Sequence, residues 1–197
     1  MEYFVSVITA LFINIIAENI IFTRSIGTDL TAFIGKNRGS APIFGAAVTY
    51  LCTVTDIFVW LFDKNYGSAQ NYRFYQPIFY ITVLCLVYFA SLALIWKFSE
   101  ETAEKAKKYL HFAVFNSAVL GTMLLSSKNF DTFSEYFFGG LGSGLGFSFA
   151  LFLTAPIYEK TESGDVPAAF RGYPLLMIYI GILSMAFFGI TGKVPAF

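Results

Sequence analysis

Six apolar stretches, each close to the length of a membrane span, dominate this chain of 197 residues. About 20 apolar residues in a helix cross the hydrocarbon core of a bilayer, and only helices or closed barrels satisfy their backbone hydrogen bonds there. Only 13% of the residues are charged, compared with about 25% in soluble domains. We therefore predict an all-α integral membrane protein with a single domain, residues 1–197, embedded in a lipid bilayer. The predicted spans are 3–22, 41–62, 77–96, 109–125, 137–157 and 173–190.

Basic residues are shared unevenly between the two sets of loops, and this bias predicts the orientation. Because basic residues favour cytoplasmic loops, we expect the loops after the first, third and fifth spans to be cytoplasmic and both termini to lie outside. The predicted location is the cytoplasmic (inner) membrane of a bacterium or archaeon. The formal net charge is zero, so no basic surface for nucleic acid is expected. The predicted cytoplasmic side carries Lys36, Arg38, Lys97, Lys105, Lys107, Lys108, Lys160 and Arg171, and the other side carries Lys64, Arg73, Lys128 and Lys193.

Polar residues interrupt the first and fourth spans. Glu18 and Asn19 lie deep in the first, and Asn116 and Ser117 lie near the middle of the fourth. A charged residue in hydrocarbon costs about 2.5–3.5 kcal/mol on insertion scales, so such residues usually serve a function. With three spans per half, the halves run in opposite directions. We predict six transmembrane helices in two inverted three-helix repeats, with helices one and four broken or short.

The chemistry expected at these interruptions is an ion or small-solute path. Glu18, Asn19 and Asn116 are the predicted lining residues. The alternative is that they fix helix packing through interhelical hydrogen bonds. Asp29 either caps a half-helix that begins at Leu30 or lies in the headgroup region, depending on where the first span is broken.

Glycines at the start of the fifth span predict close helix contacts. The pairs Gly140/Gly144 and Gly142/Gly146 each form a G-x-x-x-G pattern, which lets helix backbones approach closely in membranes. A phosphate-binding loop is a poor alternative, because no Lys-Ser/Thr pair follows the glycines. The only cysteines, Cys52 and Cys85, lie in different apolar stretches and are interpreted as small residues of helix packing. The sequence indicates no catalytic residues and no metal-binding motif.

Several motifs together resemble a known family. The segments 165–172 (Asp-Val-Pro-Ala-Ala-Phe-Arg-Gly) and 184–192 closely resemble the final loop and helix of the RnfA/NqrE family, membrane subunits of ion-translocating electron-transport complexes. Residues 116–121 (Asn-Ser-Ala-Val-Leu-Gly) resemble that family's Asn-Cys-Ala-Val-Leu-Gly motif. Glu18-Asn19 followed by Gly27 is similar to its first-helix pattern, so the resemblance covers nearly the whole chain.

This resemblance implies a partner, a cofactor and two cofactor-binding positions. Family members pair with a homologous subunit of RnfE/NqrD type, and the two subunits together hold a [2Fe-2S] cluster inside the membrane. The cluster relays electrons while the complex moves Na⁺ or H⁺. The two family cysteines fall on Asp29 and Ser117 here. Since iron–sulfur clusters are held by thiolates, we expect this chain to bind no cofactor alone, and to be a non-catalytic or electron-relay subunit of the translocase.

Two other functions stay open from the sequence. One is a transporter or channel that works without redox chemistry on the same inverted scaffold. The other is a purely structural subunit of a larger complex. The first would move ions or solutes in vesicles without an electron donor, whereas in the second a neutral residue at Glu18 would change assembly and leave transport intact.

Overall fold

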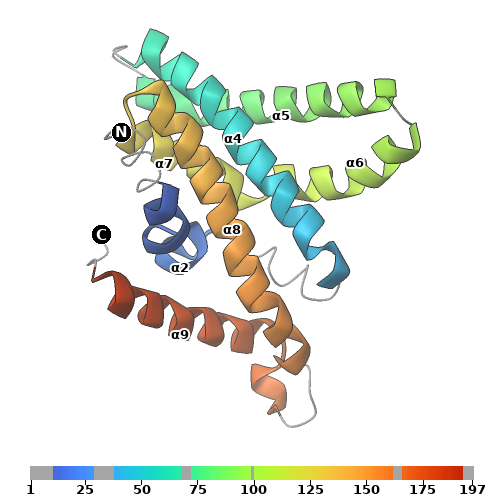
Figure 1. Cartoon of the computed structure of the whole chain (residues 1–197), viewed down its shortest axis with the longest axis vertical. Helices are drawn as coiled ribbons and strands as arrows, with labels where there is room; N and C mark the ends of the chain where they lie inside the picture. The colour runs from blue at the N-terminus through green and yellow to red at the C-terminus, as the bar shows by residue number, and fades with distance from the viewer. Residues whose placement is uncertain (1–10, 29–37, 68–71, 99, 162–165, 193–197) are drawn as a thin grey trace.

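The computed structural model describes residues 11–28, 38–67, 72–98, 100–161 and 166–192, and within these ranges it contains helices and no strand (Figure 1). The long helices bury a continuous apolar core between them. The elements are the π-helix η1 (Ile13–Ala17), α2 (Ile20–Arg24), the 3₁₀ turn η2 (Arg38–Ser40), α4 (Ala41–Tyr66), α5 (Tyr72–Phe98), α6 (Glu100–Val114), α7 (Ser117–Asn129), α8 (Phe133–Thr161), the 3₁₀ turn η3 (Ala168–Phe170) and α9 (Tyr173–Thr191).

Membrane-spanning helices are confirmed, and the fourth span is broken as predicted. Within the described residues, α4, α5, α8 and α9 are each long and apolar enough to cross a membrane, and α6 and α7 form a fifth, bent candidate span. Between these two helices the direction of the chain bends by 52°. The first predicted span begins in residues 1–10, which lie outside the described residues, so it is observed only from Leu11 onward.

The long helices extend beyond the predicted spans, most clearly in two places. Helix α5 begins at Tyr72, so Pro77 lies inside the helix instead of at its start. Proline removes one backbone hydrogen bond, which membrane helices tolerate when nearby groups compensate. The apolar part of the fourth span was predicted to start at residue 109, and α6 begins at Glu100. The charged segment 100–108 was predicted to extend a helix at the membrane surface, and the structure confirms that it is helical.

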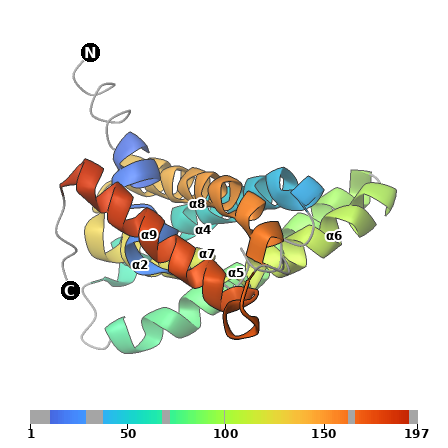
Figure 2. The same cartoon turned by 90° about the horizontal axis from the view of Figure 1, so that it is seen from below.

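The central packing contact joins α4 and α8, which run side by side (Figures 1 and 2). A Cβ atom at Gly144 would lie 2.4 Å from Cα of Thr49, and one at Gly140 would lie 2.8 Å from the carbonyl oxygen of Cys52. These two glycines therefore let the backbones of α4 and α8 touch. The close packing predicted for this glycine pair is confirmed.

The other glycine pair lies against the first segment of the chain. A Cβ atom at Gly142 would lie 2.8 Å from Cβ of Asn14, and one at Gly146 would lie 3.2 Å from the Asn14 carbonyl oxygen. Helix α8 therefore packs against α4 through Gly140 and Gly144, and against η1 through Gly142 and Gly146. This arrangement places the break in the first span directly against α8.

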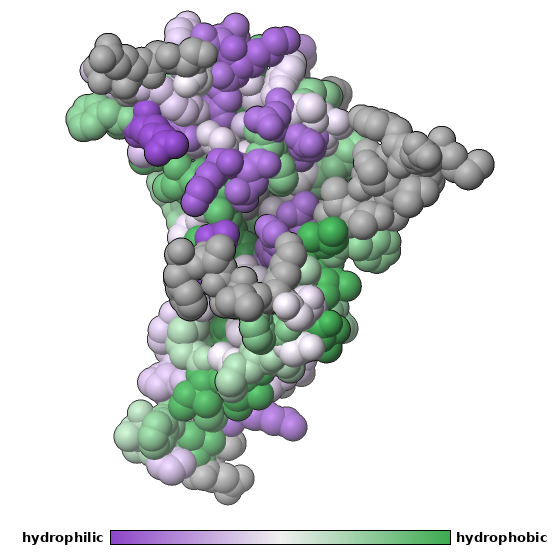
Figure 3. All heavy atoms as spheres, turned by 90° about the vertical axis from the view of Figure 1, so that its left-hand side faces the viewer, coloured by the Kyte–Doolittle hydropathy of each residue, from purple (hydrophilic) through white to green (hydrophobic). Residues whose placement is uncertain are grey.

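Large apolar side chains remain exposed on the outer helices. They are most numerous on α5 and α9, as expected for helices whose outer surface contacts lipid. On the face shown in Figure 3, hydrophilic residues gather toward the end where α4 passes to α5 and α7 passes to α8, and hydrophobic residues are more frequent below. Examples of exposed apolar residues are Phe74, Ile78, Leu86, Phe89 and Trp96 on α5 and Ile182, Met185 and Ile190 on α9.

Candidate functional site

Asn19 forms the break in the first span. The π-helix η1 ends at Ala17, and α2 begins immediately after Asn19. The Asn19 Oδ1 atom accepts hydrogen bonds from the N–H groups of Ile21 and Phe22, at 3.1 and 3.4 Å. Side-chain acceptors at this position satisfy the free N–H groups that begin a helix. Asn19 is 0% exposed, so the break is a packed feature of the interior.

Asn116 forms the equivalent break in the fourth span. Its Oδ1 atom accepts a hydrogen bond from the Ala118 N–H at 3.0 Å and caps α7. Asn116 is 1% exposed, and its Nδ2 atom has no hydrogen-bond partner among the described residues. Each broken span therefore restarts from a buried asparagine. This repetition matches the prediction that helices one and four are broken in corresponding places.

The two breaks meet at Gly27 and Ser117. The Ser117 Oγ atom accepts a hydrogen bond from the Gly27 N–H at 3.0 Å. Gly27 has a φ of +87°, which side-chain-bearing residues rarely adopt. A Cβ atom there would lie 2.8 Å from Cβ of Ala118 and 2.9 Å from Cε2 of Phe147. The backbone after α2 thus lies directly on the start of α7. We call this contact between Gly27 and the Asn116–Ala118 segment the helix-break junction.

The other two predicted site residues, Glu18 and Asp29, are not seen at the helix-break junction. Glu18 is exposed, one residue before the buried Asn19. Asp29 lies outside the described residues. The structure therefore brings Asn116 and Ser117 against the segment that follows the first break, and it shows both asparagines acting as helix caps.

The sequence patterns did not single out a buried carboxyl group in α4. Asp56 is 0% exposed, although it belongs to a helix long and apolar enough to span a membrane. Its Oδ2 atom accepts a hydrogen bond of 2.6 Å from the Ser126 hydroxyl of α7. Its Oδ1 atom is buried and has no hydrogen-bond partner among the described residues. The sequence could have pointed to Asp56, because it is the only acidic residue in the predicted span 41–62, and a charged residue in such a span usually serves a function.

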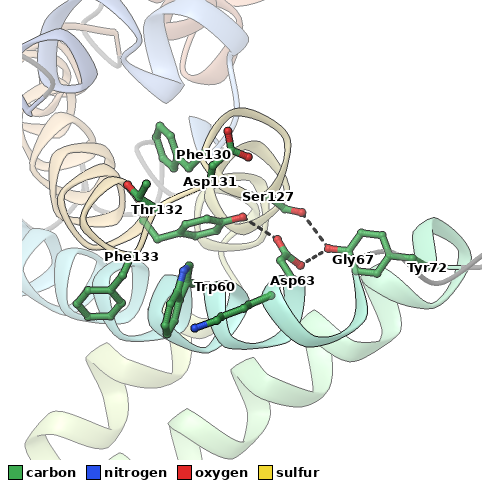
Figure 4. Close-up of a pocket in the computed structure, with 11 residues that line it drawn as sticks. Trp60, Asp63, Gly67, Tyr72, Ser127, Phe130, Asp131, Thr132 and Phe133 are labelled. Carbon is green, nitrogen blue, oxygen red and sulfur yellow. Dashed lines mark hydrogen bonds between the residues drawn. The ribbon is translucent and has the colours of Figure 1, made fainter.

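A pocket of about 480 Å³ lies two helical turns further along α4, beside Asp63 (Figure 4). Tyr80 and Tyr136 donate hydrogen bonds to the Asp63 carboxylate at 3.0 and 2.8 Å, and Tyr72 donates a third. Ser127 lies 3.1 Å from the Tyr72 hydroxyl. Residues from the α4–α5 and α7–α8 ends line one pocket, so these two connections lie on the same side of the molecule, as the predicted topology requires.

Comparison with known proteins identifies the fold family. The sequence pattern of the family described as "Rnf-Nqr subunit, membrane protein" matches residues 7–194. The chain belongs to this Rnf-Nqr family. The resemblance deduced from the motifs is therefore confirmed over almost the whole chain.

Curated relatives match the Rnf-Nqr chain along nearly their whole length. One subunit of the Na(+)-translocating ferredoxin:NAD(+) oxidoreductase complex of Acetobacterium woodii is 28% identical over 185 residues, which cover 94% of each chain. One subunit of the ion-translocating oxidoreductase complex of Pectobacterium carotovorum is 30% identical over 185 residues, covering 93% of this chain and 96% of the relative. The corresponding subunit of Vibrio vulnificus is 28% identical over 181 residues, covering 92% and 94%.

The described donor atoms of this Rnf-Nqr subunit do not fit an iron–sulfur cluster. Such clusters take thiolate ligands, whereas the helix-break junction presents the Ser117 hydroxyl, which already accepts the Gly27 N–H. Cys52 is buried in α4, where its Sγ atom lies 3.8 Å from the Thr122 hydroxyl, and Cys85 lies on α5. Across the described part of the chain, no three His, Cys, Asp or Glu side chains form a group that could hold a metal.

Proposed function

We propose that this chain is a membrane subunit of an ion-translocating electron-transport complex, working as a scaffold and ion-conducting subunit without sulfur ligands of its own. Family membership and the names of the relatives support the general role. The observation that carries the specific role is the helix-break junction. The chain keeps two capped, broken helices in contact, but an oxygen atom of Ser117 takes the place in its motif where the resembled family has sulfur.

The proposed partner is a homologous membrane subunit of RnfE/NqrD type, together with further subunits of the same complex. The positions of Asp29 and Ser117 in the family motifs are proposed as this chain's contribution to the site shared with that partner. A protonated serine hydroxyl does not replace a thiolate as an iron ligand. The electron route through the complex therefore does not depend on sulfur supplied by this chain. The complex is proposed to lie in the inner membrane, with both termini of this chain outside.

The proposed ion path passes the two helix breaks. Glu18, Asn19 and Asn116 are its proposed lining residues, and the burial of both asparagines at the two breaks supports this assignment. Polar groups at broken membrane helices commonly mark substrate or ion sites. Glu18→Gln is expected to lower ion flux while the complex still assembles. Loss of the assembled complex with unchanged flux per assembled unit would assign Glu18 a structural role instead.

The experiment that tests the proposed function isolates the complex through an affinity tag on this chain. We expect other redox subunits to copurify with it. Iron and acid-labile sulfide are then measured per complex for the wild type and for Asp29→Cys/Ser117→Cys. The double variant is expected to gain iron and sulfide that the wild type lacks. Ser134→Cys, at the start of α8, is the matched control and is expected to gain neither.

Two results would overturn the proposal. The first is a chain that purifies without redox subunits and moves ions into vesicles in the absence of any electron donor, which would indicate a redox-independent transporter. The second is a wild-type iron and sulfide content that falls in Ser117→Ala, which would show that this chain does ligate a cluster.

A further inference from the structure

Asp56 is a carboxyl group sealed inside the helix bundle. Gly140 of α8 packs directly onto it, since a Cβ atom at Gly140 would lie 2.9 Å from the Asp56 Oδ2 atom. Gly140 is two helical turns, about 10 Å, from the start of α8. Asp56 therefore lies well inside the span. Its Oδ2 atom accepts the Ser126 hydroxyl at 2.6 Å, and its buried Oδ1 atom lacks a partner among the described residues.

No cation among the described residues neutralises Asp56. The titratable groups that act on it are the Cys52 thiol and the Asp63 carboxyl of α4 and the Tyr136 phenol of α8. From α7 it contacts the neutral Ser126 hydroxyl. Lys64, the lysine of the nearby pocket, lies over the ring of Trp60, at 4.9 Å from its centroid. An isolated carboxylate is strongly disfavoured in an apolar interior, so Asp56 requires a bound positive ion.

A proton is the ion that this environment fits. Metal cations in proteins take several oxygen ligands at once, whereas the only hydrogen-bond partner of the Asp56 carboxyl among the described residues is the Ser126 hydroxyl. Gly140 packs against the same carboxyl and leaves little room for a coordination shell. A proton needs only one carboxylate oxygen, and the Oδ2 atom, which lies against the Ser126 hydroxyl, is within reach of a proton donor.

Hydroxyl groups lie between Asp56 and the pocket beside Asp63. Ser126 contacts Asp56, and the next residue, Ser127, lies 3.1 Å from the Tyr72 hydroxyl. Tyr72 in turn donates a hydrogen bond to Asp63. Figure 4 shows Ser127 and Asp63 converging on the Tyr72 hydroxyl. These hydrogen bonds leave one step open, between the hydroxyls of the consecutive residues Ser126 and Ser127.

We propose that Asp56 is a proton-binding site inside the membrane, which is loaded and emptied through the hydroxyl groups of Ser126, Ser127 and Tyr72 that lie between it and the Asp63 carboxylate. The reversible step is the addition of one proton to the Asp56 carboxylate and its release toward Asp63. The idea that this proton takes part in ion translocation rests on the proposed function. The idea that Asp56 binds a proton is independent of it, because it follows from the burial and contacts of this side chain alone.

The first test uses dicyclohexylcarbodiimide, which adds covalently to protonated carboxyl groups in apolar surroundings. Membranes containing the full-length chain in its native complex are treated at several pH values without an electron donor, and the α4 peptide is analysed by mass spectrometry. We expect modification at Asp56, and a fall of about tenfold per pH unit once the site has lost its proton. Asp56→Asn should abolish the modification, whereas Asp131→Asn, an exposed acid of the pocket rim, should leave it unchanged.

Infrared difference spectroscopy keeps the proposal testable if Asp56→Asn does not fold. The wild type is expected to show the C=O stretch of a protonated carboxyl group that shifts in D₂O. Ser127→Ala should preserve this band and slow its exchange with D₂O by about tenfold or more, since it removes one hydroxyl of the relay. Gln76, which also contacts Ser127, is left in place so that the pocket keeps its packing.

Three outcomes would overturn the proposal. Absence of both the Asp56 modification and the carboxyl band in the wild type would show that no proton is bound. Protection of Asp56 by NaCl but not by choline chloride would show that the site binds Na⁺. Unchanged exchange in Ser127→Ala would remove the proposed route. None of these results depends on copurifying redox subunits, so the proposal and the proposed function can fail separately.

Discussion

The Asn19 side-chain amide donates a hydrogen bond to the Gly146 carbonyl oxygen at 2.7 Å, across 127 positions of sequence. The same amide group donates to the Ile15 carbonyl oxygen at 2.9 Å. Asn19 thus uses its donors to hold η1 and α8 and its acceptor to start α2. The break in the first span is fixed by one side chain, and the absence of a Cβ atom at Gly146 allows it to approach α8.

Asn19→Ala is expected to destabilise the protein by about 2–4 kcal/mol. The change removes a helix cap, worth about 1 kcal/mol, and leaves the buried Gly146 carbonyl without this donor, which costs about 1–3 kcal/mol. Equilibrium unfolding in detergent measures the effect. Asn65→Ala is the matched control, because Asn65 makes an exposed side-chain bond on α4, and its loss should change the stability by less than about 0.5 kcal/mol. Equal effects of the two substitutions would contradict the role of Asn19.

Gly144→Ala is expected to separate α4 from α8. The new methyl group would lie 2.4 Å from Cα of Thr49, and backbone atoms cannot move aside without shifting a helix. Overpacking of this kind costs about 1–3 kcal/mol. Gly181→Ala on α9 is the control, because no atom lies within 4 Å of its Cβ position. Thermal unfolding should show a lower midpoint for Gly144→Ala and no loss for Gly181→Ala. A stable Gly144→Ala protein would show that the two helices are less closely packed than described.

The helix breaks were predictable because their cause is local. Polar side chains in the middle of an apolar stretch are costly wherever the chain folds, so Asn19 and Asn116 marked the interruptions correctly. The contact between Gly27 and Ser117 was not predictable from such a rule, since it joins residues 90 positions apart and depends on how α2 and α7 are brought together. Asp56 was visible in the sequence by the same local argument and was overlooked.

Gly27→Ala is expected to disrupt the helix-break junction. Alanine would be strained at a φ of +87°, and its methyl group would lie 2.8 Å from Cβ of Ala118. We expect a lower unfolding midpoint and a weaker association with the proposed partner subunit, measured by copurification. The double variant Gly27→Ala/Ala118→Gly should recover part of the stability, because it relieves the contact with Ala118 and not the backbone strain. Gly39→Ala, which meets no atom within 4 Å, should have little effect.

The cysteines provide the last test, because they are the only sulfur atoms of the chain that resemble cluster ligands chemically. Cys52 is buried against Thr122 in the core, whereas Cys85 is only partly buried on α5. Since α4 and α5 hold them in separate environments, we expect neither to ligate iron. Cys52→Ala and Cys85→Ala should each leave the iron content per complex unchanged. Maleimide should modify Cys52 only after unfolding. Loss of iron in either variant would mean that a cysteine outside the family motif has taken over the role of the family's cluster ligands.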